Sequence, residues 1–201
     1  MTETAFRPLP LSSLGDATGF LNPYYSTVNP ARVSSSALDV MTDLSFMPAA
    51  TIDGSVNVVA AEQLMIARGV RMLLVVNALQ HVVGLVTARD LQGDRVKHAL
   101  QAGNTAASLP VTAIMTVASA VEVLRFETVL HARVGDIIET LKGSGRQHAL
   151  VVDEDVPTAQ QKVRGVFSAS QIARQLGITS AASFDLAGTF AELDRHLHRA
   201  D

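Results

Sequence analysis

Cysteine is absent from this chain of 201 residues, so disulfide bonds, thiol catalysis and cysteine-ligated metal sites are excluded. Charge is also scarce: 17% of the residues are charged and the formal net charge is −3, which leaves no broad cationic surface for nucleic-acid phosphates. No apolar run reaches the roughly 18 residues of a membrane-spanning helix. Residues 1–8 do not combine a basic region with an apolar core, as a secretory signal would. We therefore expect a cytoplasmic protein that neither enters a membrane nor binds nucleic acid.

The sequence contains the same series of motifs twice. Met41 and Met115 are 74 positions apart, and Gly84 and Gly165 are 81 positions apart. A nearly constant offset over several motifs indicates a duplicated supersecondary unit. The matched segments are Asp39–Thr42 and Ala113–Thr116, Leu73–Asn77 and Ala149–Asp153, and Gly84–Leu91 and Gly165–Ile172. Two matching strand-to-helix turns predict two related clefts.

Each copy has the pattern of a strand, a helix, two strands joined by a hairpin, and a second helix. In the first copy, the apolar runs Met72–Val76 and Val82–Val86 predict buried strands. The preceding helix is expected to start at Ser55 as its N-cap and to end at Gly69. The apolar positions at helical spacing are Val56, Ala60, Leu64 and Ala67 in this helix, and Val134, Ile137, Ile138 and Leu141 in its counterpart.

These elements predict an α+β fold in which two β-α-β-β-α repeats pack as a pseudo-twofold pair, because a single copy would leave an apolar sheet face uncovered. The first repeat, with a short linker helix, would cover residues 38–109, and the second residues 110–178. Residues 1–37 contain Pro8, Pro10, Pro23 and Pro30 and are expected to form an irregular arm. Residues 179–201 carry apolar side chains at helical spacing and predict a C-terminal helix.

The repeated motifs resemble those of the CBS domain family, named for a domain of cystathionine beta-synthase, in a tandem pair. The resemblance rests on Val40-Met-Thr42 and Ile114-Met-Thr116, on Gly69–Val76 and on Gly84–Asp90. It implies a regulatory module that requires no cofactor and binds an adenosine-containing ligand such as AMP, ADP, ATP or S-adenosylmethionine. It also implies a homodimer. Because no catalytic or membrane domain is attached, we expect the module to act in trans on another protein.

The segment Gly84–Asp90 carries the chemistry of the first cleft. A buried strand delivers Thr87 to the start of a helix, where unpaired backbone amides favour an anion or a ribose oxygen. Asp90 lies one turn further on, and its carboxylate can accept both hydrogen bonds of a ribose diol. Thr87 can donate its hydroxyl group to a phosphate or ribose oxygen, and Arg89 can assist or face water. The same Thr-x-x-Asp spacing is also a capping box, which explains both residues without a ligand.

The resemblance assigns further residues to this main site. Arg71 matches a position where the family often carries basic residues that face phosphates. The adenine slot beside the aspartate of one copy is completed in the family by the opening segment of the other copy. Here that segment contributes Val111, Ile114 and Met115, and Leu85 would line the same slot.

The second copy departs from the family pattern. Ser168 keeps the hydroxyl group, but Gln171 stands where the ribose-binding aspartate would be. Glutamine carries no charge and one acceptor oxygen, so it would hold a diol more weakly, although it can still form a capping box with Ser168. The corresponding second site would comprise Ser168, Gln171, Val166, His148, Val40 and Met41. We expect this cleft to be weak, altered or vacant.

Other functions have little support in the sequence. His196 and His198 would point to different sides of a helix, so no metal site is expected. No glycine-rich phosphate loop or nucleophile elbow is present, and we expect no enzyme activity. The alternative to a ligand sensor is a nucleotide-independent scaffold that serves dimerisation and partner docking.

Overall fold

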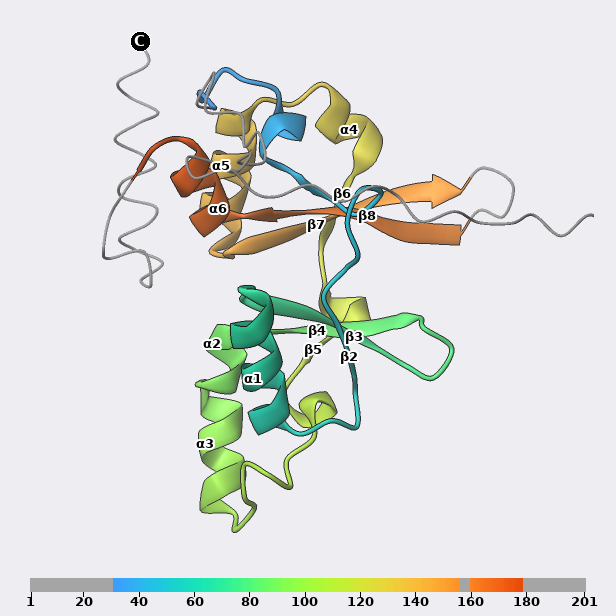
Figure 1. The fold of residues 1–201 in the computed structure, drawn as a ribbon, viewed down its shortest axis with the longest axis vertical. Helices are drawn as coiled ribbons and strands as arrows, with labels where there is room; N and C mark the ends of the chain where they lie inside the picture. Colours follow the sequence, from blue (N-terminus) through green and yellow to red (C-terminus); the bar gives the residue numbers. More distant parts are fainter. Residues whose placement is uncertain (1–30, 156–159, 179–201) are drawn as a thin grey trace, which may run out of the picture. The chain divides into compact units, whose positions relative to one another are not determined.

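Two four-stranded sheets organise the chain in the computed structural model, which describes residues 31–155 and 160–178 (Figure 1). The first sheet has the strand order β2-β3-β4-β5 and the second has the order β1-β8-β7-β6. The strands are β1 (Thr42–Asp43), β2 (Thr51–Asp53), β3 (Met72–Val76), β4 (Val82–Thr87), β5 (Thr116–Val117), β6 (Val123–Arg125), β7 (His148–Asp155) and β8 (Gln160–Ser168). The α+β repeat architecture predicted from the sequence is confirmed.

The two sheets have the same internal topology. In the first, β2 runs parallel to β3 and β3 runs antiparallel to β4; in the second, β6 runs parallel to β7 and β7 antiparallel to β8. The parallel pairs are joined by a crossover that contains a helix, as parallel strands require.

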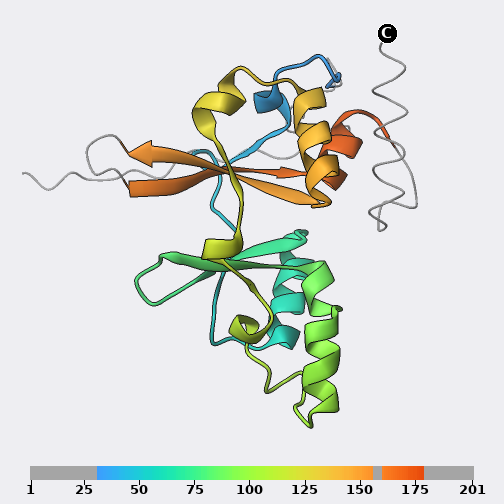
Figure 2. The same ribbon diagram turned by 180° about the vertical axis from the view of Figure 1, so that it is seen from behind.

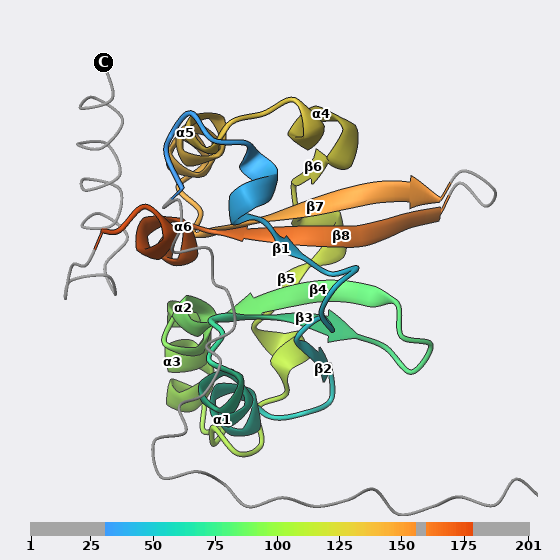
Figure 3. The ribbon, with the colours of Figure 1, turned by 45° about the horizontal axis from the view of Figure 1, so that its top comes forward.

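Each sheet is completed by a strand from the other copy. β1, from the opening segment of the first copy, pairs antiparallel with β8, with Thr42 opposite Val166 (Figure 3). β5, from the opening segment of the second copy, pairs antiparallel with β4, with Leu85 opposite Thr116. The opening segments are thus exchanged between the copies.

The helices lie on one face of each sheet (Figures 1 and 2). Those of the first copy are α1 (Val58–Arg68), α2 (Ala88–Leu91) and α3 (Asp94–Gln101), and those of the second are α4 (Phe126–Leu130), α5 (Val134–Ser144) and α6 (Ala169–Gln175). Short 3-10 helices cover Ala37–Val40 (η1), Val111–Ala113 (η2) and Ala118–Ala120 (η3). Among the residues with described positions, none of the helices is long and apolar enough to cross a bilayer.

The N-terminus of α1 differs from the prediction. Asn57, not Ser55, is the N-cap, and its side chain accepts a hydrogen bond from the backbone N of Ala60 at 2.9 Å. Ser55 donates its hydroxyl group to Asp53 instead. At the other end, Gly69 adopts the left-handed conformation with φ of 63°, as predicted for a C-terminal cap.

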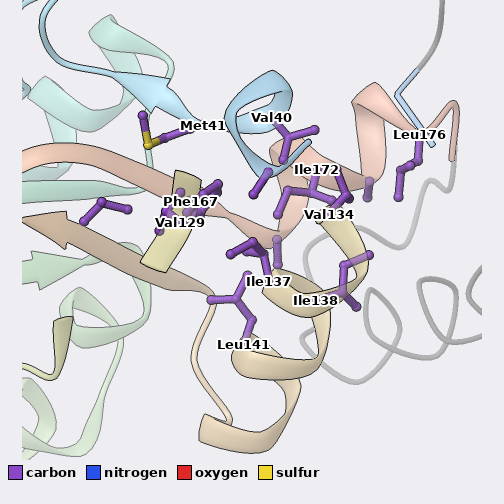
Figure 4. Packing of buried hydrophobic residues seen from close by; sticks show 14 residues of the cluster. Val40, Met41, Val129, Val134, Ile137, Ile138, Leu141, Phe167, Ile172 and Leu176 are labelled. Carbon is purple, nitrogen blue, oxygen red and sulfur yellow. The ribbon is translucent and has the colours of Figure 1, made fainter. Parts of the chain in front are cut away.

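The apolar face of α5 is confirmed, and that of α1 is wrong in part, since of its predicted residues Val56 and Leu64 pack against the core. Val134, Ile137, Ile138 and Leu141 are all buried in the core of the second sheet (Figure 4). In α1 the buried residues are Val58, Ala61 and Met65, whereas Ala67 is exposed. Because α1 is apolar around most of its circumference, spacing alone does not select the face that packs on the sheet.

The faces of the sheets that the helices leave uncovered pack against each other. Met72 and Leu74 of β3 and Leu150 of β7 are buried in this contact, and Leu85 and Val166 pack beside them. The two copies therefore bury their remaining apolar sheet surface together, as the sequence predicted.

Part of the predicted N-terminal arm belongs to the core of the second copy. The backbone of Ser35 accepts a hydrogen bond from Val134 N, and Ala37 is fully buried. Residues 1–30 of the arm and the predicted C-terminal helix lie outside the described residues.

Candidate functional site

Of the cavities lined by both sheets, one lies beside the first turn of α2 and one beside the first turn of α6. The cavity beside α2, named here the Asp90 cavity, has a volume of about 210 Å³. The cavity beside α6, named the Gln171 cavity, has a volume of about 180 Å³. The two clefts predicted from the duplicated strand-to-helix turns are therefore both present as cavities.

Thr87 and Asp90 form a capping box at the start of α2. The Asp90 carboxylate oxygen Oδ2 accepts hydrogen bonds from Thr87 N at 2.8 Å and from Thr87 Oγ1 at 2.6 Å. Asp90 N donates in return to Thr87 Oγ1 at 3.3 Å. The hydroxyl hydrogen of Thr87 is therefore committed to Asp90, so in this arrangement Thr87 orients the carboxylate.

The capping box leaves half of the Asp90 carboxylate unused. Both accepted bonds go to Oδ2, and no described residue donates a hydrogen bond to Oδ1. Asp90 is half-buried and lines the cavity. Capping and ligand binding are thus compatible, because they use different oxygens of one carboxylate.

The second copy supplies the opposite wall of the Asp90 cavity. Thr116 comes from the exchanged strand β5, and Arg146, Gln147 and His148 come from the end of α5 and the start of β7. Arg146 forms an ion pair with Glu122, with 3.1 Å between Nη2 and Oε2. Apolar wall residues are Met72, Leu85, Val121 and Leu150.

The structure brings together only part of the predicted main site. Asp90, Thr87, Arg89 and Leu85 line the Asp90 cavity. Arg71, assigned to the same site from the sequence, lines the Gln171 cavity instead. Arg71, which precedes β3 of the first copy, lines the Gln171 cavity, and Arg146, which precedes β7 of the second copy, lines the Asp90 cavity.

The three residues predicted to complete the adenine slot lie elsewhere. Val111 and Ile114 are buried in the core of the first sheet, with 0% and 1% of their surface exposed. Met115 packs on that core from its rim, and its carbonyl oxygen accepts a hydrogen bond from Arg95 Nη1 at 2.7 Å. The opening segment of the second copy reaches the cavity through Thr116.

The Gln171 cavity contains four of its six predicted residues: Ser168, Gln171, Val166 and His148. The other two, Val40 and Met41, are buried in the core of the second sheet. The predicted capping box between Ser168 and Gln171 is wrong, because the Ser168 side chain makes no capping hydrogen bond. Gln171 Oε1 instead accepts a hydrogen bond from Thr42 Oγ1 at 3.1 Å, and Ser168 Oγ lies 3.1 Å from Ser170 Oγ.

Two residues that the sequence analysis missed occupy matching positions. Thr116 lines the Asp90 cavity and Thr42 lines the Gln171 cavity, each delivered by an exchanged strand. Both follow a methionine in the repeated Met-Thr motif, so the repeat could have predicted that they occupy equivalent positions. Arg146 and Arg174 had no such signal, because their positions depend on how the sheets pack.

His148 lines both cavities. Burial lowers the pKa of the His148 imidazole to about 4, and the positive charge of Arg71 adds to this effect. The ring is therefore neutral at pH 7, so it can accept a hydrogen bond at one nitrogen and donate from the other.

We expect the stability of the protein to fall as the pH drops from about 6.5 to about 4. In this window the unfolded chain binds a proton at residue 148 and the folded chain does not, so protons favour unfolding. The full pKa difference corresponds to about 3 kcal/mol, and partial solvent exposure reduces the expected loss to about 1–2 kcal/mol. Urea unfolding at pH 7.5 and pH 4.5 measures it.

His148→Gln should reduce that difference between the two pH values by the same amount, whereas His81→Gln in the exposed β3–β4 hairpin should leave it unchanged. Equal pH dependence in the His148→Gln variant and the parent protein would contradict the assignment.

The described residues hold no cluster of three or more histidine and acidic side chains that could bind a metal ion. The Asp90 cavity instead combines a carboxylate oxygen open to a diol, cationic side chains and an apolar wall. This arrangement can hold a small molecule with a sugar ring, a flat apolar group and a negative charge.

Comparison with known proteins supports the fold. Residues 37–93 match the sequence profile of the CBS domain. An uncharacterized conserved protein from Pyrococcus horikoshii is similar in structure, with a TM-score of 0.52 and 21% identity over 71% of this chain and 92% of that protein. A CBS-domain containing protein from Agrobacterium tumefaciens has a TM-score of 0.52 and 19% identity over 77% of this chain and 98% of that protein. Among curated proteins the comparison finds no match.

Proposed function

We propose that this chain, whose residues 37–93 match the CBS domain and whose two copies both contribute to each cavity, is a regulatory module that binds an adenosine-containing ligand in the Asp90 cavity. CBS domain pairs are in general regulatory and not catalytic. The observation that carries the proposal is the Asp90 carboxylate, which lines the cavity and is held by the capping box through Oδ2, while no described residue donates a hydrogen bond to Oδ1.

The parts of the ligand match the parts of the cavity. A ribose diol would donate to Asp90, and the base would lie among Met72, Leu85 and Leu150. A phosphate or other anionic group would be held by Arg89 and Arg146, since guanidinium groups bind phosphate with charge-assisted hydrogen bonds. The volume of about 210 Å³ is below the roughly 300–1,000 Å³ of typical ligand pockets. We therefore expect the nucleoside to be enclosed and the phosphate to lie at the mouth.

Regulation would follow from the shared walls of the cavity. A ligand that touches both copies binds some arrangements of the two sheets more tightly than others, and it shifts the population toward them. In this proposal a partner protein recognises the favoured arrangement in trans, in the cytoplasm. Ile66 on α1 and Leu100 on α3 are 74% and 43% exposed and offer apolar surface for a second copy in a homodimer.

Asp90→Ala is expected to weaken binding of the nucleoside ligand by about 10- to 100-fold, because charged hydrogen bonds contribute about 1.5–3 kcal/mol. Calorimetric titration with AMP, ADP, ATP and S-adenosylmethionine would identify the ligand and measure the loss. The matched control is Asp136→Ala. Asp136 accepts a hydrogen bond from Arg133 N at 2.8 Å at the start of α5. The Asp136→Ala variant therefore loses a similar capping hydrogen bond at a position outside both cavities.

Both variants should lose about 1 kcal/mol of stability, and only Asp90→Ala should lose ligand affinity. The 2′-deoxy analogue of the bound nucleotide should bind the parent protein as weakly as the nucleotide binds Asp90→Ala. If none of the four ligands binds the parent protein at millimolar concentration, the sensor proposal is wrong. The scaffold function, which the complete capping box also allows, would then replace it.

A further inference from the structure

The Gln171 cavity differs from the Asp90 cavity in the sign of its charge. The Asp90 cavity is lined by two arginines, Arg89 and Arg146, and by two carboxylates, Asp90 and Glu122. The Gln171 cavity is lined by two arginines, Arg71 and Arg174, and none of its described lining residues is acidic. Among the described lining residues, the charged side chains of the Asp90 cavity balance in number, and those of the Gln171 cavity are all basic.

The charged groups of the Gln171 cavity are hydrogen-bond donors. The side-chain oxygen of Gln171 accepts the Thr42 hydroxyl group, and its amide NH₂ can donate to a ligand. Arg71 and Arg174 are donors without acceptor capacity. A carboxylate such as that of Asp90 holds a ribose diol best, and the described lining of this cavity has none. An anion needs donors, so this cavity suits an anion better than a ribose.

The rest of the wall is apolar. The loop between β1 and β2 contributes Met47, Pro48, Ala49 and Ala50, and Leu74 and Val166 come from the two sheets. Such a wall favours a ligand with an apolar body, because each apolar group that it removes from water stabilises the complex. The volume of about 180 Å³ restricts that body to a small one.

We propose that the Gln171 cavity binds a small organic anion with an apolar body, held by Arg71 and Arg174, and that it does not bind a nucleoside. This site is additional to the proposed nucleoside site and stands whether or not the Asp90 cavity binds adenosine. The two cavities would then bind two classes of ligand. The residue that distinguishes the cavities is Gln171, which occupies the position of Asp90 in the other copy.

Benzenesulfonate is the probe, because it stays ionised at every pH at which the protein folds, and methyl phenyl sulfone is its neutral analogue of similar shape. We expect calorimetric titration of the full chain to show saturable binding of benzenesulfonate and at least about tenfold weaker binding of the sulfone. Arg174→Gln should weaken benzenesulfonate binding by about tenfold, as expected for the loss of one charged hydrogen bond. Arg174 is exposed, so this variant should fold normally.

Two further variants locate the site. Arg89→Gln, in the Asp90 cavity, should leave benzenesulfonate affinity within about twofold of the parent value, which is ordinary for a contact outside the site. Gln171→Asp places a carboxylate beside the anion and should weaken binding by about tenfold through like-charge repulsion.

Equal binding of the sulfone and the sulfonate would overturn the proposal, as would loss of benzenesulfonate binding in Arg89→Gln but not in Arg174→Gln. Displacement of benzenesulfonate by AMP in the Asp90→Ala variant would also overturn it, because the nucleotide would then occupy the Gln171 cavity. None of these outcomes depends on whether AMP binds the Asp90 cavity, so the two proposals can fail separately.

Discussion

Phe167→Ala is expected to lower the free energy of unfolding by about 3–5 kcal/mol. Phe167 on β8 is fully buried in the core of the second sheet, where it lies beside Val129 (Figure 4). Truncation removes the transfer free energy of the ring and leaves a cavity that the surrounding strands and helices can fill only in part. Because single domains are stable by only about 5–15 kcal/mol, this loss is a large fraction of the total.

Phe46→Ala is the matched control for this prediction. The same ring is deleted, but Phe46 is 87% exposed, so the change should stay within about 0.5 kcal/mol. Urea unfolding followed by circular dichroism compares both variants with the parent protein. Similar losses in the two variants would mean that the core of the second sheet is not packed around Phe167.

Gly84→Ala is expected to cost about 2–3 kcal/mol, as an overpacked position does. A Cβ atom at residue 84 would lie 2.5 Å from the carbonyl oxygen of Thr116 and 2.8 Å from Met115 Sδ. The carbonyl belongs to β5, which pairs with β4 at this point, so the backbone of the exchanged strand would have to move. Thr116 lines the Asp90 cavity, and we expect nucleoside affinity to fall together with stability.

Gly165 and Gly143 supply graded controls for the same experiment. For a Cβ atom at Gly165, the counterpart of Gly84, the three nearest atoms all belong to the side chain of Met41, with Sδ at 2.6 Å. Methionine is flexible, so Gly165→Ala should cost less than Gly84→Ala. Gly143 in α5 has open space around it, and Gly143→Ala should stabilise the protein by about 0.5–1 kcal/mol. A loss in Gly165→Ala as large as that in Gly84→Ala would contradict the role of the Thr116 carbonyl.

Local sequence patterns predicted the parts of the site that depend on local interactions. The Thr87-x-x-Asp90 spacing predicted the capping box, and the repeat predicted a cleft at each strand-to-helix turn. Gln171 shows the limit of this reasoning. Its spacing from Ser168 also predicted a capping box, but a hydrogen bond from Thr42, a residue distant in the sequence, engages its side chain instead.

The exchange of segments between the copies could not be predicted from composition or spacing. The family resemblance assigned Arg71 to the Asp90 cavity, yet Arg71 lines the Gln171 cavity because of how the two sheets pack. The family resemblance assigned Val111 and Ile114 to a ligand wall, but both are apolar and lie in the core of the first sheet. An apolar residue at the edge of a sheet is compatible with both positions, and only the tertiary fold decides between them.

The exchanged strands also determine which parts of the chain can open independently. If the first sheet opens, β5 loses its pairing with β4, and the segment that leads into the second copy is released. If the second sheet opens, β1 loses its pairing with β8, and the segment that leads into the first copy is released. The contact between the sheets around Met72, Leu74 and Leu150 is lost in either event. We therefore expect that neither β3 nor β7 can unfold locally while the other copy stays folded. The amide protons of β3 and β7 should exchange with solvent through one shared event, so that the duplicated unit behaves as a single foldon.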